Sequence, residues 1–181
     1  MVKVILYICV SADGFIADKN GGVEWLDEYG ASDQDCGYKD FYNSIDALVY
    51  GKNTYEQVLT FKPWPYPDKK SYIFADKDAP TTAANNVEFV HVDIPQFIKD
   101  LDAKAIKRLW LMGGAKLAES FYKLGLIDEY EIAIMPKKIG DGIPLLPEIV
   151  EGRGMELLKE TKWHSGVVKG MVQKVYKKNR S

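Results

Sequence analysis

Short apolar runs alternate with helix-like segments along most of the chain, and this alternation predicts the fold class. The apolar runs are rich in β-branched and aromatic residues, and each is bounded by residues that favour turns. We expect strands at residues 2–10, 47–50, 71–75, 87–90, 108–112 and 129–135, and helices at 35–44, 54–59, 94–101 and 116–124. Strands that alternate with helices form a mainly parallel sheet with helices on both faces, so the pattern predicts an α/β fold.

The helix expected at 116–124 has the clearest amphipathic pattern. Leu117, Phe121 and Leu124 lie at positions i, i+4 and i+7, so we expect them to form one buried stripe. Gly125 stands where a glycine commonly ends a helix. The pattern therefore predicts both the buried face of this helix and its end.

The pattern changes after Pro136, where two strand-like segments follow each other directly. Residues 157–164 and 167–177 are separated by Ser165-Gly166, which is typical of an antiparallel hairpin. The sheet is therefore expected to be mixed. No repeat, low-complexity linker or change in composition marks a domain boundary, so we expect residues 1–181 to form one domain.

Composition and charge narrow the class of protein. The chain has 181 residues, of which 46% are hydrophobic, so it can build a core without a metal or a disulfide. Its two cysteines form no CxxC pair and it has only two histidines, so we expect no zinc site. A net charge of −2 and the lack of an apolar stretch of about 20 residues disfavour nucleic acid and membranes as partners. We expect a reduced, cytoplasmic protein.

A strand followed by two glycines and a helix is the first candidate for a binding site. Gly113-Gly114 ends the strand expected at 108–112 and precedes the helix that begins near Lys116. A glycine pair lets the backbone approach a ligand, and the free N–H groups at a helix start favour phosphate. The alternative is a turn that needs glycine only for steric reasons.

A second turn of this kind follows the strand at 47–50. Gly51 ends that strand, Asn53 or Thr54 can cap the next helix, and Lys52 adds a positive charge. Two such turns can hold one diphosphate from both sides. Neither has the spacing of a P-loop or of the G-x-G-x-x-G fingerprint. For Lys52 alone, a solvated position in a helix cap is the alternative interpretation.

A third glycine-containing segment follows the first strand. Asp13-Gly14 is typical of a tight turn, and Gly21-Gly22 before Trp25 is typical of a mobile loop that closes over a site. Each feature taken alone is also explained as an ordinary structural turn.

The order of these segments is more specific than any one of them. The motifs are Ser11-x-Asp13-Gly14-x-Ile16-Ala17, Gly51-Lys52-x-Thr54-Tyr55-Glu56, Met112-Gly113-Gly114-x-x-Leu117-x-x-x-Phe121, Gly125-Leu126-Ile127-Asp128-Glu129 and Ile139-Gly140-Asp141-Gly142-Ile143-Pro144-Leu145. Together they resemble the dihydrofolate-reductase-like superfamily over nearly the whole chain, and most closely the C-terminal reductase domain of the bifunctional riboflavin-biosynthesis deaminase/reductase. The resemblance implies a three-layer α/β domain with a mainly parallel central sheet, an antiparallel C-terminal hairpin and NADPH as the cofactor.

The resemblance also implies which residues meet the cofactor. The nicotinamide would be lined by the backbone at Cys9, Ile16 and Ala17. The phosphates of the adenosine half would be met by Gly51, Lys52, Asn53 and Thr54, and the diphosphate by Gly113, Gly114, Ala115, Lys116 and Leu117. The adenosine-side loop would consist of Ala75, Asp76 and Lys77. A point charge at Lys77 favours the 2′-phosphate of NADPH, whereas Asp76 beside it disfavours that phosphate. The preference for NADPH over NADH therefore stays open at this point.

Asp35 is the candidate catalytic acid. Counting back from Gly51, Asp35 falls where the resemblance implies a carboxylate on the first helix that supports protonation of the substrate. Asp33 is an alternative acid, and an ion pair with Lys39 four residues later is an alternative role for Asp35.

Aromatic residues near the predicted first helix are the candidate substrate contacts. A planar ring favours flat apolar walls, and Trp25, Tyr38, Tyr42 and Phe41 are the residues we expect there. Ordinary core packing is the alternative for each, above all for Phe41.

The resemblance implies an NADPH-dependent reductase that transfers hydride to a small heterocycle, either pterin-like or ribosylaminopyrimidine-like. The only arginines are Arg108, Arg153 and Arg180, which disfavours a phosphorylated substrate. One alternative is a protein that binds the nucleotide without catalysis. Another is a dimerising scaffold that pairs through Met171, Val175 and the hairpin. The resemblance implies a homodimer, because related domains are commonly dimers.

Overall fold

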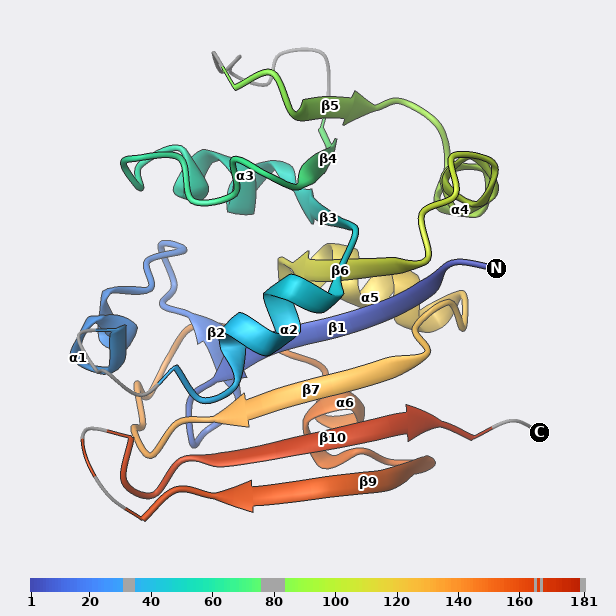
Figure 1. The fold of residues 1–181 in the computed structure, drawn as a ribbon. Helices are drawn as coiled ribbons and strands as arrows, with labels where there is room; N and C mark the ends of the chain where they lie inside the picture. The colour runs from blue at the N-terminus through green and yellow to red at the C-terminus, as the bar shows by residue number, and fades with distance from the viewer. Residues whose placement is uncertain (31–34, 76–83, 165, 167, 180–181) are drawn as a thin grey trace.

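The computed structural model describes residues 1–30, 35–75, 84–164, 166 and 168–179, and most of their strands form one large twisted sheet (Figure 1). The eight strands of this sheet lie in the order β5-β4-β3-β6-β1-β7-β10-β9 within the described residues. In chain order they are β1 (Lys3–Val10), β3 (Ala47–Gly51), β4 (Lys70–Phe74), β5 (Val87–Val90), β6 (Arg108–Gly113), β7 (Glu129–Ile134), β9 (Met155–Lys162) and β10 (Val172–Lys178). All six strands predicted before Pro136 are present, within one residue at each end.

The sheet is mixed, as the pattern predicts. Every neighbouring pair from β5 to β7 is parallel, whereas β10 pairs antiparallel with both β7 and β9. Parallel neighbours need a long crossover connection, and helices lie between most consecutive parallel strands of the chain, whereas β9 and β10 follow each other without one. The predicted mainly parallel sheet with a C-terminal antiparallel hairpin is confirmed.

Helices cover both faces of the sheet (Figure 1). On one face lie α2 (Tyr38–Ser44) and α3 (Lys52–Val58), and on the other lie α4 (Ile94–Ala103), α5 (Ala115–Lys123) and α6 (Pro147–Glu151). The central strand β1 is buried on both sides because Leu6 packs in the core that includes α5, while Ile5 packs in the core that includes α2. This double burial explains why the strand is a continuous apolar run rather than an alternating one.

Several short elements have no counterpart in the prediction. The strands β2 (Phe15–Ala17) and β8 (Ile143–Pro144) pair antiparallel beside the large sheet. A short 3-10 helix, η1 (Glu24–Leu26), and α1 (Asp27–Gly30) follow β2. Elements of two to four residues are too short for a hydrophobic period to identify them.

The buried face of α5 differs from the prediction at its last member. Phe121 is fully buried and Leu117 packs against the same core, but the side chain of Leu124 is 50% exposed. Leu124 is the C-cap residue, beyond the part of the helix that packs on the sheet, and Ala118 is buried instead. Gly125 adopts the predicted left-handed conformation, with φ of 64°, and donates its N–H to Tyr122 O at 2.8 Å.

The C-terminal hairpin is shorter than predicted. The second strand begins at Val172 and not at residue 167, so residues 163–171 connect the two strands in place of a two-residue turn. Trp163 and Met171 extend the pairing by one backbone hydrogen bond of 3.0 Å, and Val168 and Met171 are 3% exposed. Met171 therefore packs inside the chain and does not belong to a self-pairing surface.

No helix among the described residues has both the length and the apolar character that crossing a membrane requires.

Candidate functional site

The two glycine turns lie next to each other at one edge of the sheet. Gly51 ends β3 and is the N-cap of α3, and Gly114 follows β6 and is the N-cap of α5. Because β3 and β6 are neighbouring parallel strands, their carboxyl ends meet at the same edge. A Cβ added to Gly114 would lie 3.3 Å from Thr54 Oγ1, and one added to Gly51 would lie 4.0 Å from Leu117 Cβ. Each turn therefore contacts the helix that begins at the other.

Both helix starts are free of side-chain caps. Neither α3 nor α5 has a side chain hydrogen-bonded at its N-cap, so the first N–H groups of both helices point at the shared edge. Gly113 has φ of 113° and is joined to Gly114 by a cis peptide bond. A Cβ at Gly113 would lie 3.5 Å from Ile8 Cδ1. Glycine is needed at this position because other residues rarely adopt that φ.

The remaining predicted cofactor residues lie on the same two elements or beside them. Asn53 and Thr54 are in the first turn of α3, and Ala115, Lys116 and Leu117 form the first turn of α5. Lys52 Nζ lies 3.9 Å from Glu56 Oε1 one turn later, and both side chains are partly exposed. Ala75 directly follows β4, whereas Asp76, Lys77 and the alternative acid Asp33 lie outside the described residues.

Asp13 joins two of the predicted motifs that are distant in the sequence. Its carboxylate accepts the Ser11 hydroxyl at 2.6 Å and the backbone N–H groups of Ile139 and Gly140 at 3.2 and 2.9 Å. The Ser11 hydrogen bond is the main reason that the pKa of Asp13 is lowered, and the two backbone N–H groups lower it further.

The backbones of these two motifs also approach closely. A Cβ at Gly142 would lie 2.2 Å from Ala17 O, so only glycine fits there. Ala17 is buried and Ile16 packs against the main core, which fixes the segment that the resemblance assigns to the nicotinamide.

Cys9, at the carboxyl end of β1, lies in a separate cluster with Trp25. This cluster has a core of Ala133, Met135, Val168 and Met171, against which Cys9, Trp25, Leu26, Tyr29, Cys36 and Trp163 pack. Burial raises the pKa of the Cys9 thiol to about 11, and the nearby Cys36 thiol adds to the rise. We call this group the indole cluster, because two tryptophans from opposite ends of the chain meet in it.

The expected aromatic walls separate into two groups. Trp25 is in the indole cluster, whereas Tyr38 packs against Trp110, with ring centroids 6.0 Å apart, and stacks on Tyr42 at the same separation. The Tyr42 hydroxyl donates to Asp68 Oδ1 at 2.5 Å. Phe41 is 6% exposed, so core packing is the correct interpretation for that residue.

Asp35 does not lie on a helix. The helix expected from residue 35 begins at Tyr38, because Gly37 before it has φ of 84° and serves as the N-cap. The exposed Asp35 carboxylate accepts the backbone N–H groups of Gly37 and Lys39, each at 3.2 Å. The alternative role expected for Asp35, an ion pair with the Lys39 side chain, is therefore replaced by a hydrogen bond from the Lys39 backbone N–H.

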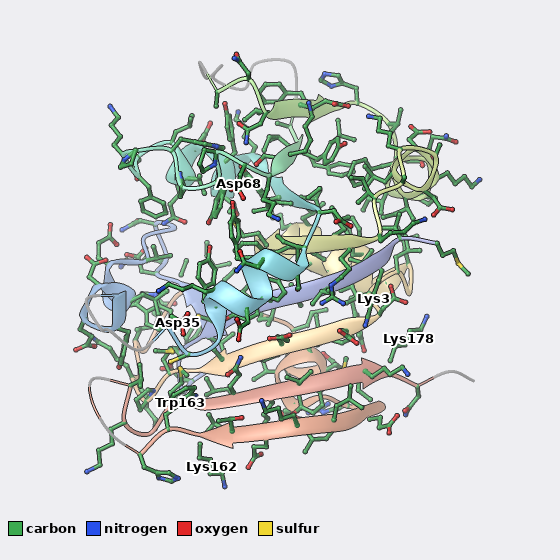
Figure 2. The ribbon with its side chains drawn as sticks, viewed as in Figure 1. Lys3, Asp35, Asp68, Lys162, Trp163 and Lys178 are labelled. Atoms are coloured by element: carbon green, nitrogen blue, oxygen red, sulfur yellow. The ribbon has the colours of Figure 1, made fainter. Side chains whose placement is uncertain are left out.

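The prediction missed Tyr7 and Trp163. Tyr7 stacks on Phe41 with ring centroids 4.3 Å apart, and burial is the main cause that raises its pKa, with smaller contributions from Cys9, Glu131 and Cys36. Tyr7 lies two residues before Cys9 on one strand, which places both on the same face and was a usable signal. In Figure 2, Trp163 lies at the same end of the sheet as Asp35, opposite Lys3 and Lys178.

Comparison with known proteins finds a family model and a relative that each cover more than half of this chain. The family model described as the RibD C-terminal domain matches residues 53–168. The uncharacterized protein YwjB of Bacillus subtilis is 37% identical over 156 residues, which are 86% of this chain and 88% of that protein.

Solved structures extend the likeness to the whole chain. A Shewanella sp. PV-4 protein provisionally assigned to riboflavin biosynthesis has a TM-score of 0.84 and 29% identity, covering 99% of this chain and 100% of that one. Dihydrofolate reductase from Enterococcus faecalis, solved with NADP(H), has a TM-score of 0.71 over 98% of this chain and 97% of its own. Its 16% identity shows a shared fold alone.

Proposed function

Because the chain belongs to the family of the RibD C-terminal domain, we propose that it is an NADPH-dependent reductase that transfers hydride to a small heterocyclic substrate. The observation that carries the proposal is the pair of uncapped, glycine-initiated helices that meet at one sheet edge, with Gly114 against Thr54. Backbone N–H groups in this arrangement bind the oxygens of a diphosphate. The likeness in fold to a dihydrofolate reductase solved with NADP(H) supports a nicotinamide cofactor.

The residues at this edge fit a dinucleotide. Side chains at Gly51 and Gly114 would occupy the space that a diphosphate needs for close backbone contact. The first turns of α3 and α5 would hold the phosphates, and the segment from Ile16 to Ala17 would lie against the nicotinamide. When bound, the reduced nicotinamide supplies the hydride, while the protein orients the two reactants and excludes water.

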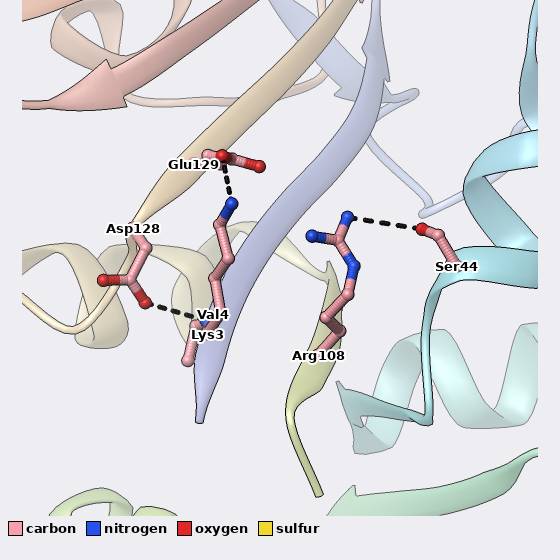
Figure 3. Close-up of polar contacts among 6 residues, drawn as sticks. All are labelled: Lys3, Val4, Ser44, Arg108, Asp128 and Glu129. Carbon is pink, nitrogen blue, oxygen red and sulfur yellow. Dashed lines mark hydrogen bonds and ion pairs between the residues drawn. The ribbon is translucent and has the colours of Figure 1, made fainter. Parts of the chain in front are cut away.

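The positions of the arginines favour a substrate without a phosphate group. Arg108 begins β6 and donates to the Ser44 hydroxyl at 3.3 Å, beside the Lys3 to Glu129 ion pair (Figure 3). These groups lie at the amino ends of the parallel strands, opposite the glycine turns. Arg153 is exposed and bonds to Glu151 at 2.6 Å. A pterin-like ring therefore fits the described part of the chain better than a ribosylaminopyrimidine phosphate.

Asp35 remains our proposed proton source. The next residue, Cys36, packs in the indole cluster with Cys9 and Trp25, so the Asp35 carboxylate lies at the outer side of that cluster. An exposed carboxylate there can take a proton from solvent and pass it inward through a water molecule.

A cofactor titration tests the proposal. Calorimetry with NADPH is carried out on the wild-type protein, on Gly114→Val and on Ser120→Ala, which changes an exposed residue of the same helix and serves as the control. Valine at position 114 displaces the diphosphate from the backbone, so we expect a loss of affinity of roughly tenfold to a hundredfold, the equivalent of one charge-assisted hydrogen bond. Ser120→Ala should bind like the wild type.

The outcomes separate catalysis from binding. Unchanged NADPH affinity in a folded Gly114→Val variant would place the diphosphate elsewhere. If NADPH binds but no pterin or pyrimidine oxidises it in stopped-flow mixing, the chain is a binding protein without reductase activity.

A further inference from the structure

The four tryptophans of the chain differ in what their indole N–H groups meet. Trp64 Nε1 donates to Tyr66 O at 3.1 Å, and Trp110 Nε1 donates to Tyr7 O at 3.0 Å. The Nε1 atoms of Trp25 and Trp163 are buried from solvent and have no hydrogen-bond partner in the structure. Buried tryptophan N–H groups usually find an acceptor, so these two are the exception that needs an explanation.

The two unpartnered indoles belong to one cluster. Trp25 comes from η1 near the N-terminus, and Trp163 immediately follows β9 in the connection of the C-terminal hairpin. Both pack in the indole cluster together with Cys9, the residue at the carboxyl end of β1. This is the end of the sheet that also carries the two glycine turns.

The chemistry of an indole restricts what can satisfy these groups. The Nε1 atom is a donor and cannot accept a hydrogen bond, so its partner must be an acceptor such as a carbonyl oxygen. Most neighbours in the cluster are apolar side chains and thiols, which offer only weak acceptors, and the Tyr29 hydroxyl is the exception. Two donors in apolar surroundings suit a flat ring that carries carbonyl groups on its edge.

We propose that Trp163, together with Trp25, binds the substrate by donating its indole N–H to a ring carbonyl of a planar heterocycle. This inference rests on the proposed reductase function and names the chemical class of its substrate. Both N–H groups are shielded when the ring is absent, so its binding requires the side chains packed around Trp25 and Trp163 to move apart. Trp163 thereby brings the C-terminal hairpin into the substrate site.

A ring with carbonyls and its carbonyl-free parent test the proposal. The probe is lumazine, a pteridine with two ring carbonyls, titrated into the protein saturated with NADP⁺, and unsubstituted pteridine is the comparison. Trp163→Phe removes the indole N–H and keeps an aromatic ring. Trp64→Phe is the matched control, because the Trp64 N–H of the wild-type protein is already hydrogen-bonded to Tyr66 O. We expect Trp163→Phe to weaken lumazine binding roughly tenfold, the loss of one buried hydrogen bond, and Trp64→Phe to change it less than about twofold.

The wild-type protein provides a readout that needs no folded variant. The indole N–H resonances of Trp163 and Trp25 should shift on addition of lumazine and stay in place with pteridine, while those of Trp64 and Trp110 should not move. Equal lumazine affinity of Trp163→Phe and wild type, static Trp163 and Trp25 resonances, or no lumazine binding at all would overturn the proposal. NADPH affinity is measured separately, so loss of the proposed function is distinguished from loss of this substrate site.

Discussion

Replacing Asp35 with asparagine and with alanine separates a proton-donating role from a capping role for this carboxylate. Its two oxygens accept the Gly37 and Lys39 N–H groups at 3.2 Å, and the side chain is exposed. Asparagine keeps one acceptor, so we expect a loss of about 0.5 kcal/mol or less in the free energy of unfolding. Alanine removes both contacts at the start of α2, and we expect a loss of about 1 kcal/mol.

The two substitutions have a different effect on catalysis. A proton donor contributes roughly 100-fold to 10,000-fold to a reduction step, which is about 3 to 5 kcal/mol of barrier. If Asp35 is the donor, asparagine and alanine should slow the hydride step equally, although only alanine has a clear effect on stability. A residue that only caps α2 would show the reverse, with turnover near the wild-type rate in both variants.

The assay is a single turnover of bound NADPH mixed with dihydrofolate, followed by the near-ultraviolet absorbance of the reduced nicotinamide. Unfolding in denaturant gives the stability of each variant under the same buffer. A hydride step at the wild-type rate in Asp35→Asn would refute the assignment of Asp35 as the acid. Asp33 or a water molecule would then be the next candidate.

Three further predictions concern pH, packing and cofactor choice. Burial raises the pKa of Glu131 above the ordinary 4.5, so ionisation of this side chain lowers the free energy of unfolding as the pH rises through the folded-state pKa. Glu131→Gln should therefore be more stable than wild type at neutral pH and equal to it below pH 4.5. Denaturant unfolding at both pH values measures this difference. Phe121→Ala should lose about 3 to 5 kcal/mol, whereas Leu124→Ala on the same helix should lose less than about 0.5, and equal losses would contradict the burial difference. Lys77→Ala should reduce the preference for NADPH over NADH by roughly 1 to 2 kcal/mol in paired titrations, and an unchanged ratio would assign the 2′-phosphate to another residue, such as Lys52.

The prediction of the fold succeeded where neighbouring residues carry the information. The strands before Pro136 appear within one residue of the expected limits, because each is a continuous apolar run bounded by turn formers. It failed where two or three residues decide a boundary. The pattern predicts that α2 starts at Asp35, but the left-handed backbone at Gly37 moves its start to Tyr38. Such a conformation leaves no trace in the hydrophobic pattern.

Part of the candidate site was also predictable, because neighbouring residues indicate its two glycine turns. Gly51 and Gly114 each follow a buried strand, so their turns were visible locally, and the neighbouring positions of β3 and β6 bring them together. The two tryptophans of the indole cluster could not be paired from the pattern. Trp25 and Trp163 are far apart in the chain, and nothing beside either one indicates the other.

The sequence alone determined the six strands before Pro136, the presence of the crossover helices and the glycine turns, because strand and helix periods are properties of adjacent residues. Only the tertiary structure decided which turns share an edge, which aromatic rings are core and which indole N–H groups lack an acceptor. These features depend on strand order and on the packing of Trp163, Val168 and Met171 in one cluster with Cys9. Contacts of that kind arise when distant segments bury apolar surface together, and no local pattern encodes them.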